Sequence, residues 1–209
     1  MTIFNSRGSD HPIDVMFLDR WSPRAFTAEP ISEFDLLTMI EAGCWAASSF
    51  NSQPWRFLYA RRDTAHWERF LQLLLPFNQS WAQRASALVV FVSDPIIRQS
   101  YGSSVVVSHS HSFDTGAASS CFSLQARKMG WYVHGMTGID IEKTVTELNV
   151  PKNHRVEAAF AVGRRSTDES QLPEKLRARE RPSSRLPLSQ LAFEGGFAAS
   201  HEHARQAPA

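Results

Sequence analysis

The sequence has little cysteine, no long apolar run and almost no net charge, and each of these absences excludes a class of protein. Its two cysteines, Cys44 and Cys121, form no C-x-x-C pair, so we expect reduced thiols in a cytoplasmic protein. The longest apolar run, ALVVFV, is too short to span a bilayer, and the first ten residues lack the apolar segment of a signal peptide. A net charge of +1 gives no general attraction to nucleic acid or to a membrane surface, so we expect neither as a partner.

Several motifs that identify common enzymes are also missing. The sequence contains no G-x-x-x-x-G-K-[ST] phosphate loop, no G-x-G-x-x-G dinucleotide-binding turn and no G-x-S-x-G nucleophile turn. Two H-x-H pairs, His109 with His111 and His201 with His203, are spaced like metal ligands. Because H-x-H alone is weak evidence for a metal, we expect polar loop histidines and no metal site.

Short apolar strands alternate with helices along the chain. Hydrophobic residues make up 43% of the sequence and charged residues 21%, which is the balance of a globular domain. Residues 95–112 fit neither a helix nor a strand pattern. The order of elements predicts an α+β or mixed α/β domain with a four- or five-stranded sheet. The expected strands are 55–60, 87–93, 131–136 and 155–163, and the expected helices are 32–47, 64–75, a short one around Trp81, 114–129 and 140–150.

The first expected helix has a clear start signal. Ser32 can cap it, and Asp35 completes an S-x-x-D pattern. We expect its apolar face to consist of Phe34, Leu37, Ile40, Cys44 and Trp45. At the other end of the chain, the segment after Gly163 is rich in Arg, Ser and Pro and predicts an extended arm.

The segment RWSPRAF, residues 20–26, places Arg20, Ser22 and Arg24 at alternate positions. Alternate side chains of an extended chain share one face, and Pro23 favours extended backbone at Ser22. The pattern therefore predicts three polar side chains on one face, suited to binding a phosphate or another anion.

Four further polar patches border the expected helices and strands. Taken singly, each has an ordinary explanation as solvated charge, turn or cap. They are SSFNSQPW with Ser48, Ser49 and Asn51, FNQSW with Asn78, HGMTGID with Met136, Thr137 and Gly138, and RPSSRLP with Arg185.

Taken in order, these patches resemble the nitroreductase family of FMN-dependent oxidoreductases. The resemblance covers about residues 15–195 and rests chiefly on RWSPRAF followed by SSFNSQPWRF. It implies an α+β fold with a central mixed or antiparallel sheet of four to five strands flanked by helices. It also implies two intertwined chains with FMN in the groove between them and the C-terminal arm on the partner chain. We expect one domain over residues 1–195 and a flexible tail over residues 196–209.

Position by position, the resemblance implies contacts to FMN. Arg20 and Arg185 would hold the phosphate with help from Ser22. Arg24 would approach the N1 and C2-carbonyl edge of the ring, where a cation stabilises the reduced anion. Ser48, Ser49 and Asn51 would contact the ribityl chain and the ring edge, and Asn78 would contact the pyrimidine ring. The backbone N–H groups of Thr137 and Gly138 would face the N5 and O4 region. Trp21 and Met136 complete the expected cofactor-binding residues.

The sequence departs from the family pattern at four positions. Ala47 replaces a common proline, and Thr137 replaces a common acidic residue whose contact is made by backbone. Trp81 and Ser183 stand where some members have cations. The departures place the substrate in doubt more than the cofactor.

The resemblance implies an NAD(P)H-dependent FMN oxidoreductase that acts on a nitroaromatic, a quinone or a small carbonyl or enal. No side-chain acid, base or nucleophile is required, because the flavin carries the hydride chemistry. The alternative is a flavin-binding protein without general reductase activity, such as a flavin carrier or a flavin-consuming enzyme. Neither the acceptor nor the choice between NADH and NADPH follows from the sequence.

Overall fold

The centre of the molecule is an antiparallel sheet of four strands. The computed structural model describes residues 7–98 and 105–197. The strands are β1 (Trp55–Arg61), β2 (Ala87–Ser93), β5 (Tyr132–Met136) and β6 (Arg155–Gly163), in the spatial order β1-β2-β6-β5. All neighbouring strands are antiparallel. The expected α+β class is confirmed, and each predicted strand agrees with the structure to within one residue at either end.

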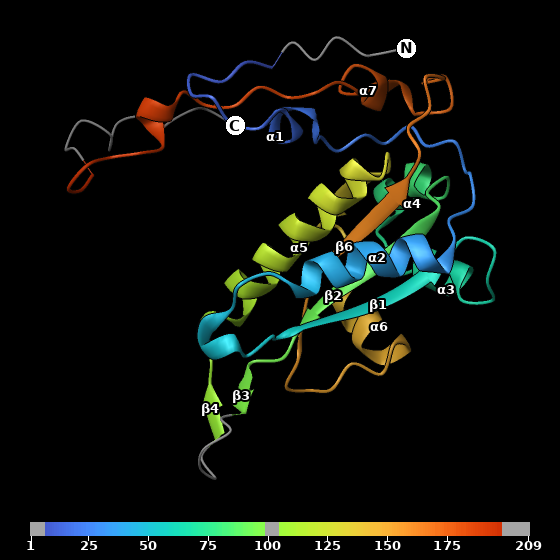
Figure 1. The fold of residues 1–209 in the computed structure, drawn as a ribbon. Helices are drawn as coiled ribbons and strands as arrows, with labels where there is room; N and C mark the ends of the chain where they lie inside the picture. Colours follow the sequence, from blue (N-terminus) through green and yellow to red (C-terminus); the bar gives the residue numbers. More distant parts are fainter. Residues whose placement is uncertain (1–6, 99–104, 198–209) are drawn as a thin grey trace.

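Helices cover both faces of this sheet, which explains why β2 is buried along its whole length (Figure 1). Its alternate side chains enter two separate cores. Leu88 and Val90 pack in the core formed with α3 (Trp67–Leu71), α4 (Pro76–Ala82) and α6 (Ile141–Glu147). Val89 and Phe91 pack in the core formed with α2 (Glu33–Cys44) and α5 (His111–Lys128).

Helix α2 begins as predicted but buries a different face. The Ser32 hydroxyl accepts a hydrogen bond from the Asp35 amide at 3.0 Å. The predicted apolar face is correct only at Ile40, because Phe34 and Trp45 are 79% and 83% exposed and Leu37 and Cys44 are exposed too. The buried residues are Leu36, Met39, Ile40 and Gly43.

The reason for this rotation is close packing against α5. A Cβ atom added at Gly43 would lie 3.2 Å from the Ala118 carbonyl oxygen and 3.3 Å from the Phe57 ring. The glycine therefore admits the neighbouring helix and fixes which side of α2 faces inward. Apolar residues occur on both sides of α2, so periodicity alone did not identify the buried side.

Three other helix boundaries differ from the predictions. Within residues 64–75 only the short helix α3 forms. Pro76 does not stop a helix but begins α4, because the first turn of a helix needs no backbone N–H from this residue. Helix α5 starts at His111 rather than at residue 114, and it ends before Gly130, whose φ of 80° suits glycine. Helix α6 is capped by Asp140 and ends at Glu147, before the predicted residue 150. The unassigned segment 95–112 contributes the hairpin of β3 (Ile96–Arg98) and β4 (Val105–Val107).

The two terminal segments lie together at one end of the molecule (Figure 1). The N-terminal segment carries α1 (Val15–Asp19), and the C-terminal segment carries α7 (Glu174–Arg177) and the short helix η2 (Leu188–Gln190). The hairpin β3–β4 lies at the opposite end of the molecule. The turn η1 (Ser49–Asn51), which is drawn in cyan, lies at that end too. Within the described ranges, no helix has the length and apolar character needed to cross a membrane. Most of the predicted tail, residues 198–209, falls outside the described residues, as do His201 and His203.

Candidate functional site

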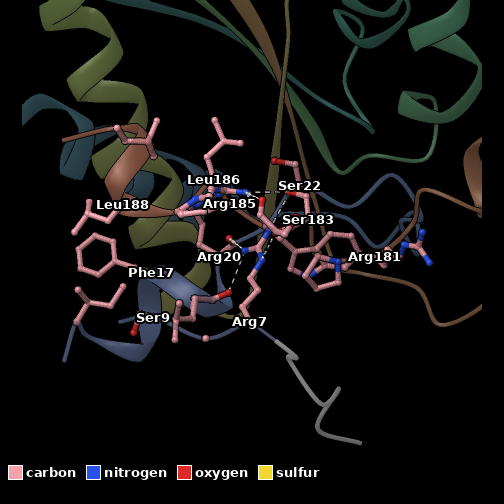
Figure 2. Close-up of a pocket in the computed structure, with 18 of the residues that line it drawn as sticks. Arg7, Ser9, Phe17, Arg20, Ser22, Arg181, Ser183, Arg185, Leu186 and Leu188 are labelled. Carbon is pink, nitrogen blue, oxygen red and sulfur yellow. Dashed lines mark hydrogen bonds between the residues drawn. The ribbon is translucent and has the colours of Figure 1, made fainter. Parts of the chain in front are cut away.

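A pocket of about 1330 Å³ lies between the two terminal segments. Arg20, Trp21, Ser22 and Arg24 line it from the N-terminal side, and Arg185 lines it from the C-terminal side. Figure 2 shows Arg20, Ser22 and Arg185 pointing into the same space. The structure thus brings together five of the twelve residues that the sequence assigned to the cofactor.

The alternation predicted for RWSPRAF is present. Trp21, Pro23 and Ala25 are buried, whereas the three polar side chains between them are only partly buried and line the pocket. The backbone is extended at Arg20, with φ −73° and ψ 116°, and Phe26 pairs with Arg165 in an isolated bridge. The expected polar face on one side of an extended chain is confirmed by this arrangement.

A buried carboxylate holds this segment in place. Glu180 is 5% exposed, and it accepts hydrogen bonds from the backbone N–H groups of Arg24 and Ala25 at 2.8 and 2.9 Å. These two donors would otherwise be buried without an acceptor, which is costly. Glu180 therefore fixes the direction in which the Arg24 side chain leaves the backbone.

The pocket is strongly cationic. Asp10 is the one carboxylate that lines it among the described residues, whereas six arginines do so: Arg7, Arg20, Arg24, Arg179, Arg181 and Arg185. Burial, with repulsion from Arg185, lowers the pKa of Arg20 below its ordinary value. Burial and repulsion from Arg185 and Arg20 lower the pKa of Arg7 in the same way. An anion between these guanidinium groups would relieve the repulsion.

Sequence reasoning missed several of these residues. Arg179, Glu180 and Arg181 alternate with period two, and this is the one signal that could have placed both arginines on a common face. A short charged run is more often simply solvated, so the signal was weak. Arg7 belongs to no motif, and His134, which also lines the pocket, opens the HGMTGID patch without having been assigned a contact.

At its inner end, formed by Arg24 and His134, the pocket is backed by the buried ring of Trp81, which does not itself line it. Trp81 is 1% exposed, and its ring lies 4.6 Å from the His134 ring and 6.0 Å from the Arg24 guanidinium carbon. Trp81 Nε1 and Arg24 Nε are both buried without a hydrogen-bond partner among the residues described. Trp81 therefore fills core volume at a position where some family members carry a cation, and it leaves an unused donor beside the pocket.

His134 remains neutral at physiological pH. Burial, followed by repulsion from Arg24, lowers its pKa from 6.5 to about 4, although hydrogen bonds to the backbone of Pro23 and Ser22 oppose the shift. Its Nδ1 lies 3.0 Å from the Pro23 carbonyl oxygen, an acceptor that favours a proton on this nitrogen.

This shift predicts a specific pH dependence of stability. Between pH 6.5 and about 4 the unfolded chain binds a proton that native His134 does not, so stability falls as the pH falls through this window. The full loss is about 3 kcal/mol. Urea unfolding at pH 7.5, 5.5 and 4.5 should show a smaller loss in His134→Gln than in the wild type. An identical pH dependence in both proteins would contradict this assignment.

Four predicted site residues lie just beyond the pocket. Asn78 on α4 donates from Nδ2 to the Gly138 carbonyl oxygen at 2.9 Å, which ties α4 to the end of β5. Thr137 is exposed there, whereas the Met136 side chain is buried in the core. Met136, Thr137 and Gly138 follow His134 in the chain, but none of the four residues lines the pocket itself.

The remaining three predicted residues are far from the pocket in this chain. Ser48, Ser49 and Asn51 belong to the turn around η1, at the opposite end of the molecule (Figure 1). The Ser49 amide donates to the buried Asp114 carboxylate at 3.1 Å. Phe50 and Asn51 have positive φ angles of 53° and 52°, a strained conformation that is typical of functional turns.

The fold and this pocket define an α+β protein with a cationic pocket between its two terminal segments. A sequence model described as the nitroreductase family matches residues 18–164. The chain therefore belongs to the nitroreductase family.

Known proteins of similar sequence or structure agree with this membership. A solved structure described as an oxidoreductase containing FMN is 44% identical, with a TM-score of 0.89 over 95% of this chain and 99% of that one. A protein of Desulfovibrio desulfuricans solved in complex with FMN is 24% identical, with a TM-score of 0.67 over 91% and 100% of the two chains, and shows the same fold. An uncharacterized 15.4 kDa protein in the ask 5′ region of Mycolicibacterium smegmatis is 32% identical over 149 residues, which cover 67% of this chain and 95% of that protein.

Proposed function

We propose that this protein is an FMN-dependent oxidoreductase that uses NADH or NADPH as its electron donor. The observation that carries the proposal is the convergence of Arg20, Ser22 and Arg185 on one pocket that Arg24 also lines. Membership of the nitroreductase family and the FMN-containing structural relative support a flavin as the ligand.

The residues present fit FMN at both ends. A phosphate carries up to about two negative charges and suits arginine forks, which here repel one another. The buried Arg24 Nε has no acceptor within the described part of the chain, and it stands where a polar edge of a ring system would supply one. The first observation is an excess of positive charge around the pocket, and the second is one buried donor without an acceptor.

Each side chain has a separate task in this proposal. Arg20 and Arg185, with Ser22, hold the phosphate, and Arg24 stabilises negative charge on the reduced ring. The backbone of Thr137 and Gly138 and the amide of Asn78 orient the ring edge. Bound FMN supplies the hydride chemistry at its N5, from NAD(P)H to a nitroaromatic, a quinone or a small carbonyl or enal.

A cofactor titration and a turnover assay test the proposal. The full-length protein should become yellow and retain FMN after dialysis, and it should oxidise NAD(P)H faster when a quinone or nitroaromatic is added. A protein that stays colourless after incubation with FMN would contradict the proposal. Retained FMN without acceptor-dependent oxidation would instead favour the alternative, a flavin carrier or a flavin-consuming enzyme.

We also propose that two chains share each site. Ser48, Ser49 and Asn51 lie too far from the pocket of their own chain to complete it, so a partner chain would supply them. Leu186, Leu188 and Leu191 in the C-terminal segment are 60%, 47% and 57% exposed, which suits packing on a second copy.

Sedimentation tests this arrangement. The FMN-loaded protein should sediment as a dimer at micromolar concentration, because shared burial of the three leucines and the ligand favours association. The combined change Leu188→Ser and Leu191→Ser should weaken the dimer and the retention of FMN together. A monomer with FMN fully bound would refute the shared site.

A site bounded by two chains also predicts ping-pong kinetics. The donor and the acceptor would use the same open side of the groove in turn, so neither would bind while the other is present. Double-reciprocal plots at several acceptor concentrations should therefore give parallel lines. Lines that intersect would show that both substrates bind at once.

A further inference from the structure

Arg7 occupies an unusual position at the junction of the two terminal segments. Its Nε donates to the Ser183 carbonyl oxygen at 2.8 Å, and its Nη1 donates to the carbonyl oxygens of Arg20 and Leu18 at 2.8 and 3.1 Å. Its Nη2 lies 3.4 Å from the Ser183 hydroxyl. One side chain thus joins the backbone on both sides of the pocket (Figure 2).

This position lies outside the part of the chain that carries the family. The family match covers residues 18–164, so neither Arg7 nor Ser183 falls within it. Ser183 stands where some family members have a lysine, and the guanidinium of Arg7 reaches that place from the N-terminal segment.

We propose that Arg7 is a positioning residue that fastens the two terminal segments around the phosphate of the bound cofactor. This inference rests on the proposed function. Arg7 directs much of its hydrogen bonding at backbone carbonyls, so it acts chiefly by setting where the Arg20 and Arg185 side chains begin, while its charge adds to theirs.

The electrostatics favour this contact more when an anion is bound. Burial, with repulsion from Arg185 and Arg20, lowers the pKa of Arg7, so the contact forms against the charge of both neighbours. A bound phosphate offsets this repulsion, and the same contact then brings the ligands of the phosphate together. Gly8, Ser9, Asp10 and His11, which follow Arg7, line the pocket and would be held in place with it.

Riboflavin separates this role from a general structural one. It has the same ring and ribityl chain as FMN but no phosphate. Binding of FMN and of riboflavin is to be measured by quenching of flavin fluorescence in the wild type, Arg7→Ala, Arg7→Lys and the control Lys175→Ala. Lys175 is an exposed cation in the same C-terminal segment that does not line the pocket.

We expect Arg7→Ala to weaken FMN binding about tenfold or more and riboflavin binding less than twofold, since Arg20 and Arg185, whose positions Arg7 sets, would contact the phosphate that riboflavin lacks. Arg7→Lys keeps the charge but not the fork that spans three carbonyls, so it should lose most of the same affinity. Lys175→Ala should bind both flavins as the wild type does.

Each other outcome overturns a defined statement. Wild-type FMN affinity in Arg7→Ala, or equal losses for both flavins, would overturn the positioning role. Wild-type FMN affinity in Arg7→Lys would show that only the positive charge of Arg7 matters. It would contradict the proposal that its hydrogen bonds hold the two segments together. A wild-type protein that binds no FMN would refute the proposed function itself, which keeps the two failures distinct.

Discussion

Replacing Arg20 by alanine is expected to weaken FMN binding by about 1.5–3 kcal/mol, or roughly 10- to 150-fold. Arg20 lines the pocket beside Arg185, and its pKa is already lowered by burial and by that neighbour, which shows that it faces a cationic space. Removing it takes away a charge-assisted contact to the phosphate. Reduction of the FMN that remains bound should proceed at close to the wild-type rate.

Replacing Arg24 by alanine should have the opposite pattern. Arg24 lies over the Trp81 ring at the inner end of the pocket, and along an extended chain it stands about 13 Å from Arg20, roughly the distance from ring to phosphate. The change should lower the flavin reduction potential and slow reduction by NAD(P)H more than it weakens FMN binding. In its proposed role Arg24 stabilises the reduced state, which binding of oxidised FMN does not measure.

Two measurements on both variants test this division of roles. FMN titration reports the phosphate contact, and stopped-flow reduction reports the contact to the ring. Equal losses in both assays for both variants would mean that the two arginines form one undivided phosphate clamp. Lys175→Ala again provides a control for the loss of a single positive charge.

Replacing Glu180 by alanine is expected to lower the free energy of unfolding by about 2–4 kcal/mol. Its carboxylate is the acceptor for the Arg24 and Ala25 amides, and Ala25 is fully buried, so water cannot replace it easily. The loss leaves two buried donors without an acceptor. Burial lowers the pKa of Arg24, and the variant would also remove the Glu180 charge that opposes this shift.

Chemical unfolding of Glu180→Ala, Glu180→Gln and Glu174→Ala measures this effect. The glutamine variant keeps one oxygen acceptor and should fall between the wild type and the alanine variant. Glu174 lies exposed in the first turn of α7, so its removal should cost at most about 0.5–1 kcal/mol through the helix dipole. A stability of Glu180→Ala equal to that of Glu174→Ala would show that the Arg24 segment does not depend on this carboxylate.

Local sequence patterns predicted the fold class and the polar segment of residues 20–26 that lines the pocket. The strands followed from short apolar runs, and the start of α2 followed from Ser32 and Asp35. The alternation of Arg20, Ser22 and Arg24 predicted one polar face because period two is a property of extended backbone itself. Helix boundaries were less accurate, since the ends of α3 and α4 depend on what packs against them.

The sequence by itself therefore determined the extended segment with its polar face and the family, because both depend on residues close together in the chain or on their order. The tertiary structure decided which side of α2 is buried, through the close contact of Gly43 with α5. It also decided that Arg7 and Arg181 join Arg20 in one pocket and that Glu180 anchors Arg24, from opposite ends of the chain. Contacts between segments more than 150 residues apart follow from packing, which no local pattern encodes.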